Sequence, residues 1–185
     1  NAGGPHCLAY GATTNHVLGA EIVLADGEVI WIGGRTRDVA GYDLVGAFVG
    51  SEGTLAIATK IVVRLMRLPE STRTLLAIFD AVDDASNAVS AIIAAGMLPS
   101  ALEMMDRNII AAVEPVIHAG FPLDAEAVLL IEVDGLEEGT VEQAEAIERI
   151  CRDNRAREVR LAVAQPDRER LWAARKTSIS ALGRL

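Results

Sequence analysis

The sequence predicts an α+β fold in two parts, the second of which is a ferredoxin-like sandwich with helices packed on one face of a sheet. Three observations support this. Strand patterns alternate with glycine-rich loops as far as the segment RLMRLPES, residues 64–71. Strand and helix patterns then alternate four times after Pro69. Finally, 51% of the 185 residues are hydrophobic, which is enough to build a sizeable core.

The first part contains a predicted hairpin in residues 19–34, GAEIVLADGEVIWIGG. Asp26 and Gly27 join its two β-branched runs, and this dipeptide suits the positive φ angles of a two-residue type I′ turn. Residues 44–50 are long enough for only one or two helical turns. Residues 50–68 predict a tight glycine-flanked loop that runs into a long apolar strand.

The second part contains four predicted strands and four predicted helices, assigned from the period of their apolar residues. The strands cover residues 72–80, 100–106, 125–135 and 157–164, and the helices cover residues 83–96, 106–120, 140–154 and 166–182.

Several polar residues and one proline predict details of these helices. Asp83 or Asp84 is expected to cap the first helix, and Thr140 with Gln143 forms a capping-box pattern in the third. Pro115 is expected to kink the second, because it removes a backbone donor. The second helix is expected to place one apolar stripe on one side, formed by Ile109, Ile110, Val113, Val116 and Ile117.

Charge and cysteine usage exclude several classes of function. With a net charge of −9, the chain is a poor candidate for binding nucleic acid, because that affinity depends on neutralising phosphates. No apolar run approaches the roughly 20 residues that cross a bilayer. Cys7 and Cys151 are far apart and have no histidine at ligand spacing, so we expect a reducing compartment, no disulfide and no metal site.

Two glycine-rich stretches, NAGG at residues 1–4 and GSEGTLAI at residues 50–57, lie beside predicted strands. Glycines let backbone amides approach a phosphate or a flat ring, and nearby hydroxyls such as Thr13, Thr14, Ser51 and Thr54 add donors. Tight turns in a strand-rich domain explain the same residues. Neither stretch has the spacing of a known dinucleotide or phosphate loop, so the composition leaves both interpretations open.

Arg175 lies in an unexpected place on the last predicted helix. Leu171, Trp172, Ile179 and Leu182 share its face at spacings of three and four. A guanidinium that points toward a core costs several kcal/mol unless it is paired. The helix pattern alone favours a side chain that reaches solvent or an ion pair with a carboxylate, for which Glu103 and Glu132 are candidates.

The chain resembles the FAD-linked oxidases of the vanillyl-alcohol oxidase type. Within them it is most similar to the subgroup of glycolate oxidase FAD subunits, D-lactate dehydrogenases and D-2-hydroxyglutarate dehydrogenases. The residues that carry the resemblance are NAGGPHCLAYGATTNHVLGAEIVLADGEV, VGSEGTLAIATKIVVRL and ERLWAARK, in matching order and spacing. The resemblance implies a partial PCMH-type FAD-binding domain (its second subdomain) over residues 1–69. It also implies an FAD-linked oxidase C-terminal cap domain over residues 70–185, incomplete at its C-terminal end.

The resemblance also implies a set of FAD contacts and one substrate contact. Arg175 corresponds to the arginine that binds the substrate carboxylate, with Lys176 and Thr177 as weaker neighbours. Ala56 departs from the family, which often has glycine there, and this methyl group is expected to crowd the loop slightly. No catalytic residue is assigned within this chain. The implied cofactor contacts are Asn1, Ala2, Gly3, Gly4, Gly11, Thr13, Thr14, Glu52, Gly53, Thr54, Leu55 and Ile57.

The implied function is oxidation of a D-2-hydroxy acid such as glycolate, D-lactate or D-2-hydroxyglutarate, by hydride transfer to FAD. The implied partners are the small hydroxy acid, an electron acceptor such as a quinone or an electron-transfer protein, and other oxidase subunits. The expected location is cytoplasmic or peripheral at the membrane. The alternative is a ferredoxin-like ligand-sensing or oligomerisation module without catalysis, since that fold serves many purposes.

The chain is expected to be a central fragment of the family's longer sequence. An upstream phosphate-binding glycine loop and a downstream histidine-rich region with metal-binding and catalytic residues are expected to lie outside it. We therefore expect these 185 residues to hold FAD weakly by themselves. We also expect the residues before Pro69 to be less well packed than the cap.

Overall fold

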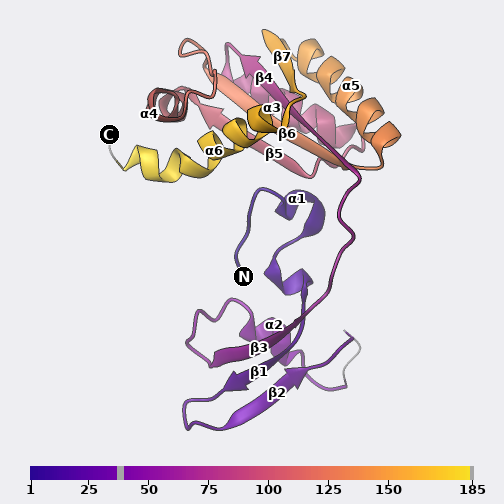
Figure 1. The fold of residues 1–185 in the computed structure, drawn as a ribbon, viewed down its shortest axis with the longest axis vertical. Coiled ribbons are helices and arrows are strands. Elements are labelled where there is room, and N and C mark those ends of the chain that lie inside the picture. The colour runs from indigo at the N-terminus through magenta and orange to yellow at the C-terminus, as the bar shows by residue number, and fades with distance from the viewer. Residues whose placement is uncertain (37–39, 184–185) are drawn as a thin grey trace. The chain divides into compact units, whose positions relative to one another are not determined.

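The computed structural model describes residues 1–36 and 40–183. The chain divides into two compact units, Asn1–Leu68 and Pro69–Leu185. Each unit has its own sheet and its own core, and each is described separately below (Figure 1).

The first unit is built on a three-stranded antiparallel sheet in the order β2-β1-β3. Its strands are β1 (Val17–Val23), β2 (Val29–Gly33) and β3 (Ile57–Val63), and its short helices are α1 (Cys7–Tyr10), the 3₁₀ turn η1 (Thr13–Asn15) and α2 (Leu44–Phe48). The core is small and consists of Ala20, Ile22, Ile32 and Ala56. Ala56, expected to crowd its loop, is 7% exposed and belongs to this core.

The predicted hairpin is present, but the prediction of its turn type was wrong. Leu24 N donates to Glu28 O at 2.9 Å and Gly27 N donates to Leu24 O at 3.0 Å, so the loop between the paired residues has three residues. Gly27 has a φ of 87° while Asp26 stays on the negative side, whereas a type I′ turn requires positive φ at both central residues. Because the loop has a third residue, Gly27 alone adopts the left-handed conformation.

The apolar run after residue 57 forms a shorter strand than the sequence predicts. The strand β3 ends at Val63, although apolar residues continue to Leu68. Leu65 and Leu68 are each 86% exposed, so this continuation has no sheet partner within the unit to cover it. Apolar character alone did not reveal where strand pairing stops.

The second unit is a four-stranded antiparallel sheet in the order β5-β6-β4-β7. Numbered within the unit, this is the order 2-3-1-4 of a ferredoxin-like sheet, and the predicted α+β fold is confirmed. The strands are β4 (Ser71–Phe79), β5 (Ala101–Asp106), β6 (Ala127–Gly135) and β7 (Glu158–Ala162). The helices are α3 (Val82–Ala94), α4 (Arg107–Ile117), α5 (Glu137–Asp153) and α6 (Gln165–Leu182).

Helices cover both faces of this sheet, so the expectation of helices on one face was wrong (Figure 1). Alternate residues of the central strands point in opposite directions. Leu75, Ala77 and Phe79 pack with residues of α3 and α5. Leu76 and Ile78 pack with residues of α4 and α6 on the opposite face. The central strands are apolar on both faces, which is the sequence feature of a doubly covered sheet.

Two of the predicted helix caps were wrong. The helix α3 has Ala81 at its N-cap with no side-chain cap, and Asp83 and Asp84 lie inside its first turn. The helix α5 begins at Glu137 rather than Thr140, and the Thr140 hydroxyl donates to Glu137 O at 2.7 Å. The capping box was therefore read one turn too late.

The second helix of the unit, α4, follows its predicted apolar stripe only in part. Ile110 and Val113 are buried, but Val116 is 52% exposed, so its placement on the stripe was wrong. Pro115 lies in the last turn, and the helix ends at Ile117. Asp106, which the sequence placed at the helix start, accepts a hydrogen bond from Ile109 N at 2.9 Å as the N-cap.

Candidate functional site

The first unit brings its two glycine-rich loops into contact, although about 50 residues separate them in the sequence. Asn1 Oδ1 accepts a hydrogen bond from Thr14 N at 3.0 Å, and Thr13 Oγ1 donates to Ala2 O at 3.2 Å. A Cβ added at Gly50 would lie 3.0 Å from Asn1 Cβ and 3.1 Å from Asn1 N. Gly50 also has a φ of 97°, so this close approach requires glycine.

A hollow of about 420 Å³ lies where these loops meet the sheet. Five residues that the sequence predicts as cofactor contacts line it: Asn1, Thr13, Glu52, Gly53 and Ile57. Phe48 and Gly50 are among the other lining residues, and neither was predicted as a contact. Gly50 could have been found, because it opens the quoted loop GSEGTLAI. Phe48 carried no such pattern.

The loop from Gly50 to Thr54 is folded tightly on itself. Ser51 O accepts hydrogen bonds from Thr54 N at 2.9 Å and from Thr54 Oγ1 at 2.6 Å. Glu52 has a φ of 52°, which is costly for a residue with a side chain. Within the described ranges, the backbone amides of Glu52 and Gly53 have no protein acceptor. They are therefore available to donate to a bound ligand.

Seven of the predicted cofactor contacts do not line this hollow: Ala2, Gly3, Gly4, Gly11, Thr14, Thr54 and Leu55. Gly3 and Gly4 are exposed, and Gly4 N donates to Cys7 Sγ at 2.9 Å. Gly11 has a φ of 82° and lies against the side chain of Asn15. Leu55 is 58% exposed. Their predicted roles stay predictions.

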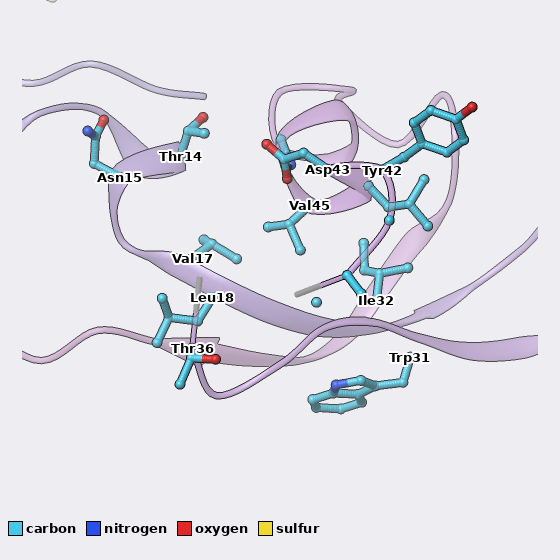
Figure 2. Close-up of a pocket in the computed structure, with 15 residues that line it drawn as sticks. Thr14, Asn15, Val17, Leu18, Trp31, Ile32, Thr36, Tyr42, Asp43 and Val45 are labelled. Atoms are coloured by element: carbon cyan, nitrogen blue, oxygen red, sulfur yellow. Dashed lines mark hydrogen bonds between the residues drawn. The ribbon is translucent and has the colours of Figure 1, made fainter. Parts of the chain in front are cut away.

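A second hollow, of about 620 Å³, lies between β1, β2 and α2 (Figure 2). Val17, Leu18 and Ile32 form part of its apolar wall, and Thr14 is the one predicted cofactor contact among its lining residues. Asp43 lines it as well, but its carboxylate accepts from Gly46 N at 2.8 Å and so caps α2.

In the second unit, Arg175 forms the ion pair that the sequence left open. Its Nε donates to Glu103 Oε2 at 2.7 Å, and its Nη1 donates to Ser178 Oγ at 3.3 Å. The side chains of Arg175 and Glu103 are 26% and 19% exposed, so the pair is mostly screened from water. The predicted apolar stripe was wrong at Ile179 and Leu182, which are 78% and 40% exposed, because Ala174, Ser178 and Ala181 are the buried residues instead.

Three side chains, at spacings of four and three residues, attach α6 to successive strands. Arg168 Nη1 donates to Thr72 O of β4, and Trp172 Nε1 donates to Glu132 Oε2 of β6, both at 2.6 Å. Arg175 then reaches β5, the next strand in the sheet order. Glu132, the other carboxylate considered for Arg175, is 8% exposed and accepts from Thr74 Oγ1 at 2.9 Å. The predicted neighbours Lys176 and Thr177 are exposed and half-buried respectively.

Over the described ranges, no group of three or more His, Cys, Asp and Glu side chains could hold a metal ion. Over the same ranges, none of the helices combines the length and apolar character needed to cross a membrane.

The second unit matches a known family model. Residues 68–185 match the model described as FAD linked oxidases, C-terminal domain. The whole chain is 46% identical over 185 residues to glycolate oxidase subunit GlcD of Escherichia coli strain K12, covering 37% of that protein. It is 45% identical over 186 residues to GlcD of Bacillus subtilis, covering 40% of it. The chain thus spans about two-fifths of the length of these relatives.

More distant matches extend the comparison. The chain is 37% identical over 177 residues to D-lactate dehydrogenase of Archaeoglobus fulgidus, covering 95% of this chain and 39% of that protein. Among solved structures, alkyldihydroxyacetonephosphate synthase superposes with a TM-score of 0.71 at 18% identity, covering 98% of this chain and 34% of that one. p-Cresol methylhydroxylase superposes with a TM-score of 0.63 at 17% identity, covering 84% and 36%. These matches confirm the resemblance drawn from the sequence and the fold.

Proposed function

Because this chain belongs to the FAD-linked oxidases, we propose that it is part of a flavoprotein that oxidises a small D-2-hydroxy acid. The observation that carries the proposal is the 46% identity to a glycolate oxidase subunit along the whole chain. FAD, when bound, would accept a hydride from the α-carbon of the hydroxy acid. A base outside the assigned residues would take the hydroxyl proton, which leaves a 2-keto acid.

We assign the cofactor contacts to the first unit. The contact of Asn1 with Gly50 and the unused amides of Glu52 and Gly53 support this assignment. A loop with glycine at its closest approach to Asn1 and with two unpaired backbone donors suits a phosphate or the edge of a flavin ring. Asn1 to Gly4, Thr13, Thr14 and Glu52 to Leu55 would then hold the cofactor, with Gly11 and Ile57 beside it. Residues 1–69 would be the partial FAD-binding domain and residues 70–185 the cap domain.

We assign substrate binding to Arg175, with Lys176 and Thr177 as weaker neighbours. A guanidinium has five N–H donors, of which Glu103 and Ser178 take one each. The planar fork of the remaining donors suits a carboxylate, which it can pair with in a bidentate manner. In this proposal the cap binds the carboxylate of the acid and so fixes the orientation of the acid for oxidation.

We propose two kinds of protein partner for the full-length protein. The name glycolate oxidase subunit implies that those relatives act within a larger assembly, and we extend this to the present protein. An electron acceptor, a quinone or an electron-transfer protein, would reoxidise the reduced cofactor.

The full-length protein with Arg175→Lys tests the substrate assignment. We expect unchanged flavin content and a kcat/KM for glycolate or D-lactate lowered about a hundredfold, since lysine keeps the charge but loses the fork. Arg170→Lys is the matched control, because Arg170 lies on the same helix, is half exposed and pairs with Asp167. Wild-type kinetics in the Arg175 variant would make that residue structural, and no flavin reduction by any 2-hydroxy acid in the wild type would refute the proposed activity.

A further inference from the structure

The ion pair between Arg175 and Glu103 has a one-sided geometry. Glu103 contacts Arg175 only through Nε, at 2.7 Å, rather than spanning two nitrogens as a bidentate pair would. Ser178 Oγ, which is buried, accepts from Nη1 at 3.3 Å while donating to Arg175 O at 2.7 Å. The guanidinium is thus held at two points, Nε and Nη1.

This arrangement leaves a usable set of donors. Within the described residues, Nη2 of Arg175 has no protein acceptor, and Nη1 has one N–H beyond the bond to Ser178. Together Nη1 and Nη2 form the end-on edge of the guanidinium, which can accept a carboxylate in a bidentate pair. The side chain is 26% exposed, so it is not sealed from solvent.

The position of the guanidinium is fixed from both ends of the interaction. Glu103 lies on β5, which pairs along its length with β6, so the carboxylate projects from a rigid strand. On the helix side, the bonds from Arg168 to Thr72 and from Trp172 to Glu132 hold α6 against the same sheet.

We propose that Glu103 is a positioning residue for substrate binding, a role that rests on the proposed function of Arg175. It holds Nε so that the Nη1/Nη2 edge faces a monocarboxylate ligand. Its own negative charge, in a mostly screened pair, also weakens the attraction of Arg175 for that ligand. Orientation and charge compensation therefore act in opposite directions on affinity, and two substitutions can separate them.

The test compares Glu103→Gln with Glu103→Ala in the full-length flavoprotein. Glutamine keeps an oxygen acceptor for Nε but removes the charge, so we expect KM for the hydroxy acid and Kd for acetate to fall about fivefold, with kcat within about twofold of wild type. Alanine removes the acceptor as well, so we expect kcat to fall about tenfold because the acid is aimed less well. Acetate binding is followed by the flavin absorbance spectrum, and flavin content checks folding.

Glu126→Gln is the matched control, because Glu126 also forms a carboxylate–guanidinium pair, with Arg107 at 2.8 Å, and does not contact Arg175. Equal kinetic constants in Glu103→Gln and wild type would overturn the inference, as would kcat values that are equal in the glutamine and alanine variants. If Arg175→Lys affects kcat/KM while Glu103→Gln does not, only this inference fails. If Arg175→Lys has no effect, the proposed substrate site fails and this inference fails with it. Should the alanine variant not fold, the glutamine variant alone still decides the charge effect.

Discussion

The two units of this chain hold their proposed site residues by different physical means. In residues 1–68, one small core of Ala20, Ile22, Ile32 and Ala56 supports loops that carry the proposed cofactor contacts. Those loops owe their shape to backbone hydrogen bonds and to left-handed residues such as Gly50 and Glu52. In residues 69–185, two cores on opposite faces of one sheet fix the helix that carries Arg175.

The difference teaches that the proposed cofactor residues of the first unit and the proposed substrate residue of the second should respond differently to substitution. Side chains on a packed helix are positioned by many contacts, so a single surface change moves them little. A loop that is positioned by a few hydrogen bonds and positive φ angles depends on each of them. We therefore expect substitutions away from Arg175 and its direct partners to move α6 little, whereas single substitutions in the loops of the first unit should shift the proposed cofactor contacts.

The largest expected contrast is in the reactivity of the two cysteines, one in each unit. Cys151 is fully buried in the core that α3 and α5 form with the sheet. This burial, with a smaller contribution from the charge of Glu148, raises the pKa of its thiol to about 12. Cys7 is partly exposed. At pH 8 iodoacetamide should label Cys7 on the order of a thousand times faster than Cys151, since only the thiolate reacts. Peptide mapping of the 185-residue chain measures both rates.

The raised pKa of the Cys151 thiol also predicts how the stability of the folded chain changes at alkaline pH. Above about pH 9 the unfolded chain loses this proton while the folded chain keeps it, so stability should fall as pH rises toward 12. Cys151→Ser should remove most of this loss, and Cys7→Ser should not. Fast labelling of Cys151 in the folded chain would mean that the core around this thiol opens readily.

The next contrast compares one substitution in the two cores. Ile131 on β6 is completely buried and Ile32 on β2 is 4% exposed, so both are core residues of a sheet. Ile131→Ala should lower the free energy of unfolding of its unit by about 3–5 kcal/mol, whereas Ile32→Ala should cost about 2 kcal/mol. The smaller core around Ile32 leaves fewer contacts to lose.

Hydrogen exchange of the 185-residue chain measures both effects, because it reports opening of each unit separately. Amides of β4 and β6 should exchange about a hundred times more slowly than those of β1 in the wild type. Equal losses of unfolding free energy in the two alanine variants would contradict the expected difference between the units, since they would show that both cores contribute alike.

Much of the second unit could be predicted from the sequence, because its elements are long and strongly periodic. The runs around Leu76 and Leu130 are apolar on both faces, and the structure places helices on both. The prediction of helices on one face was wrong because it did not take into account that these runs are apolar at consecutive positions. The boundary errors at Asp83 and Thr140 arose because short polar residues suit several positions in the first turn of a helix.

The candidate site was predictable to different degrees. The glycine-rich stretches indicated which residues lie near a ligand, and the structure brings Asn1, Thr13 and Glu52 together. The helical pattern could not tell which carboxylate pairs with Arg175, because Glu103 and Glu132 lie on neighbouring strands of the sheet. The choice depends on the rotation of α6, which Trp172 sets by bonding to Glu132. No local pattern encodes that long-range contact.

The smallest expected effect is also the one that tests the sensitive loop most directly. Gly50→Ala places a methyl group about 3.0 Å from Asn1 Cβ and forces a side chain into a φ of 97°. The left-handed conformation costs about 1–2 kcal/mol, and the contact requires the first residues of the chain to shift. In the full-length protein this should weaken FAD binding about 5- to 30-fold if the strain is relieved by moving the loop away from the cofactor.

Gly27→Ala is the matched control, because Gly27 has a similar φ of 87° and open space around its Cβ position, but lies in the hairpin loop. Gly27→Ala should therefore lose a similar amount of stability and keep its flavin content, measured by absorbance after gel filtration. Equal flavin contents in the two variants would show that the contact between Asn1 and Gly50 does not contribute to the cofactor site, and that the proposed cofactor contacts must lie elsewhere in the first unit.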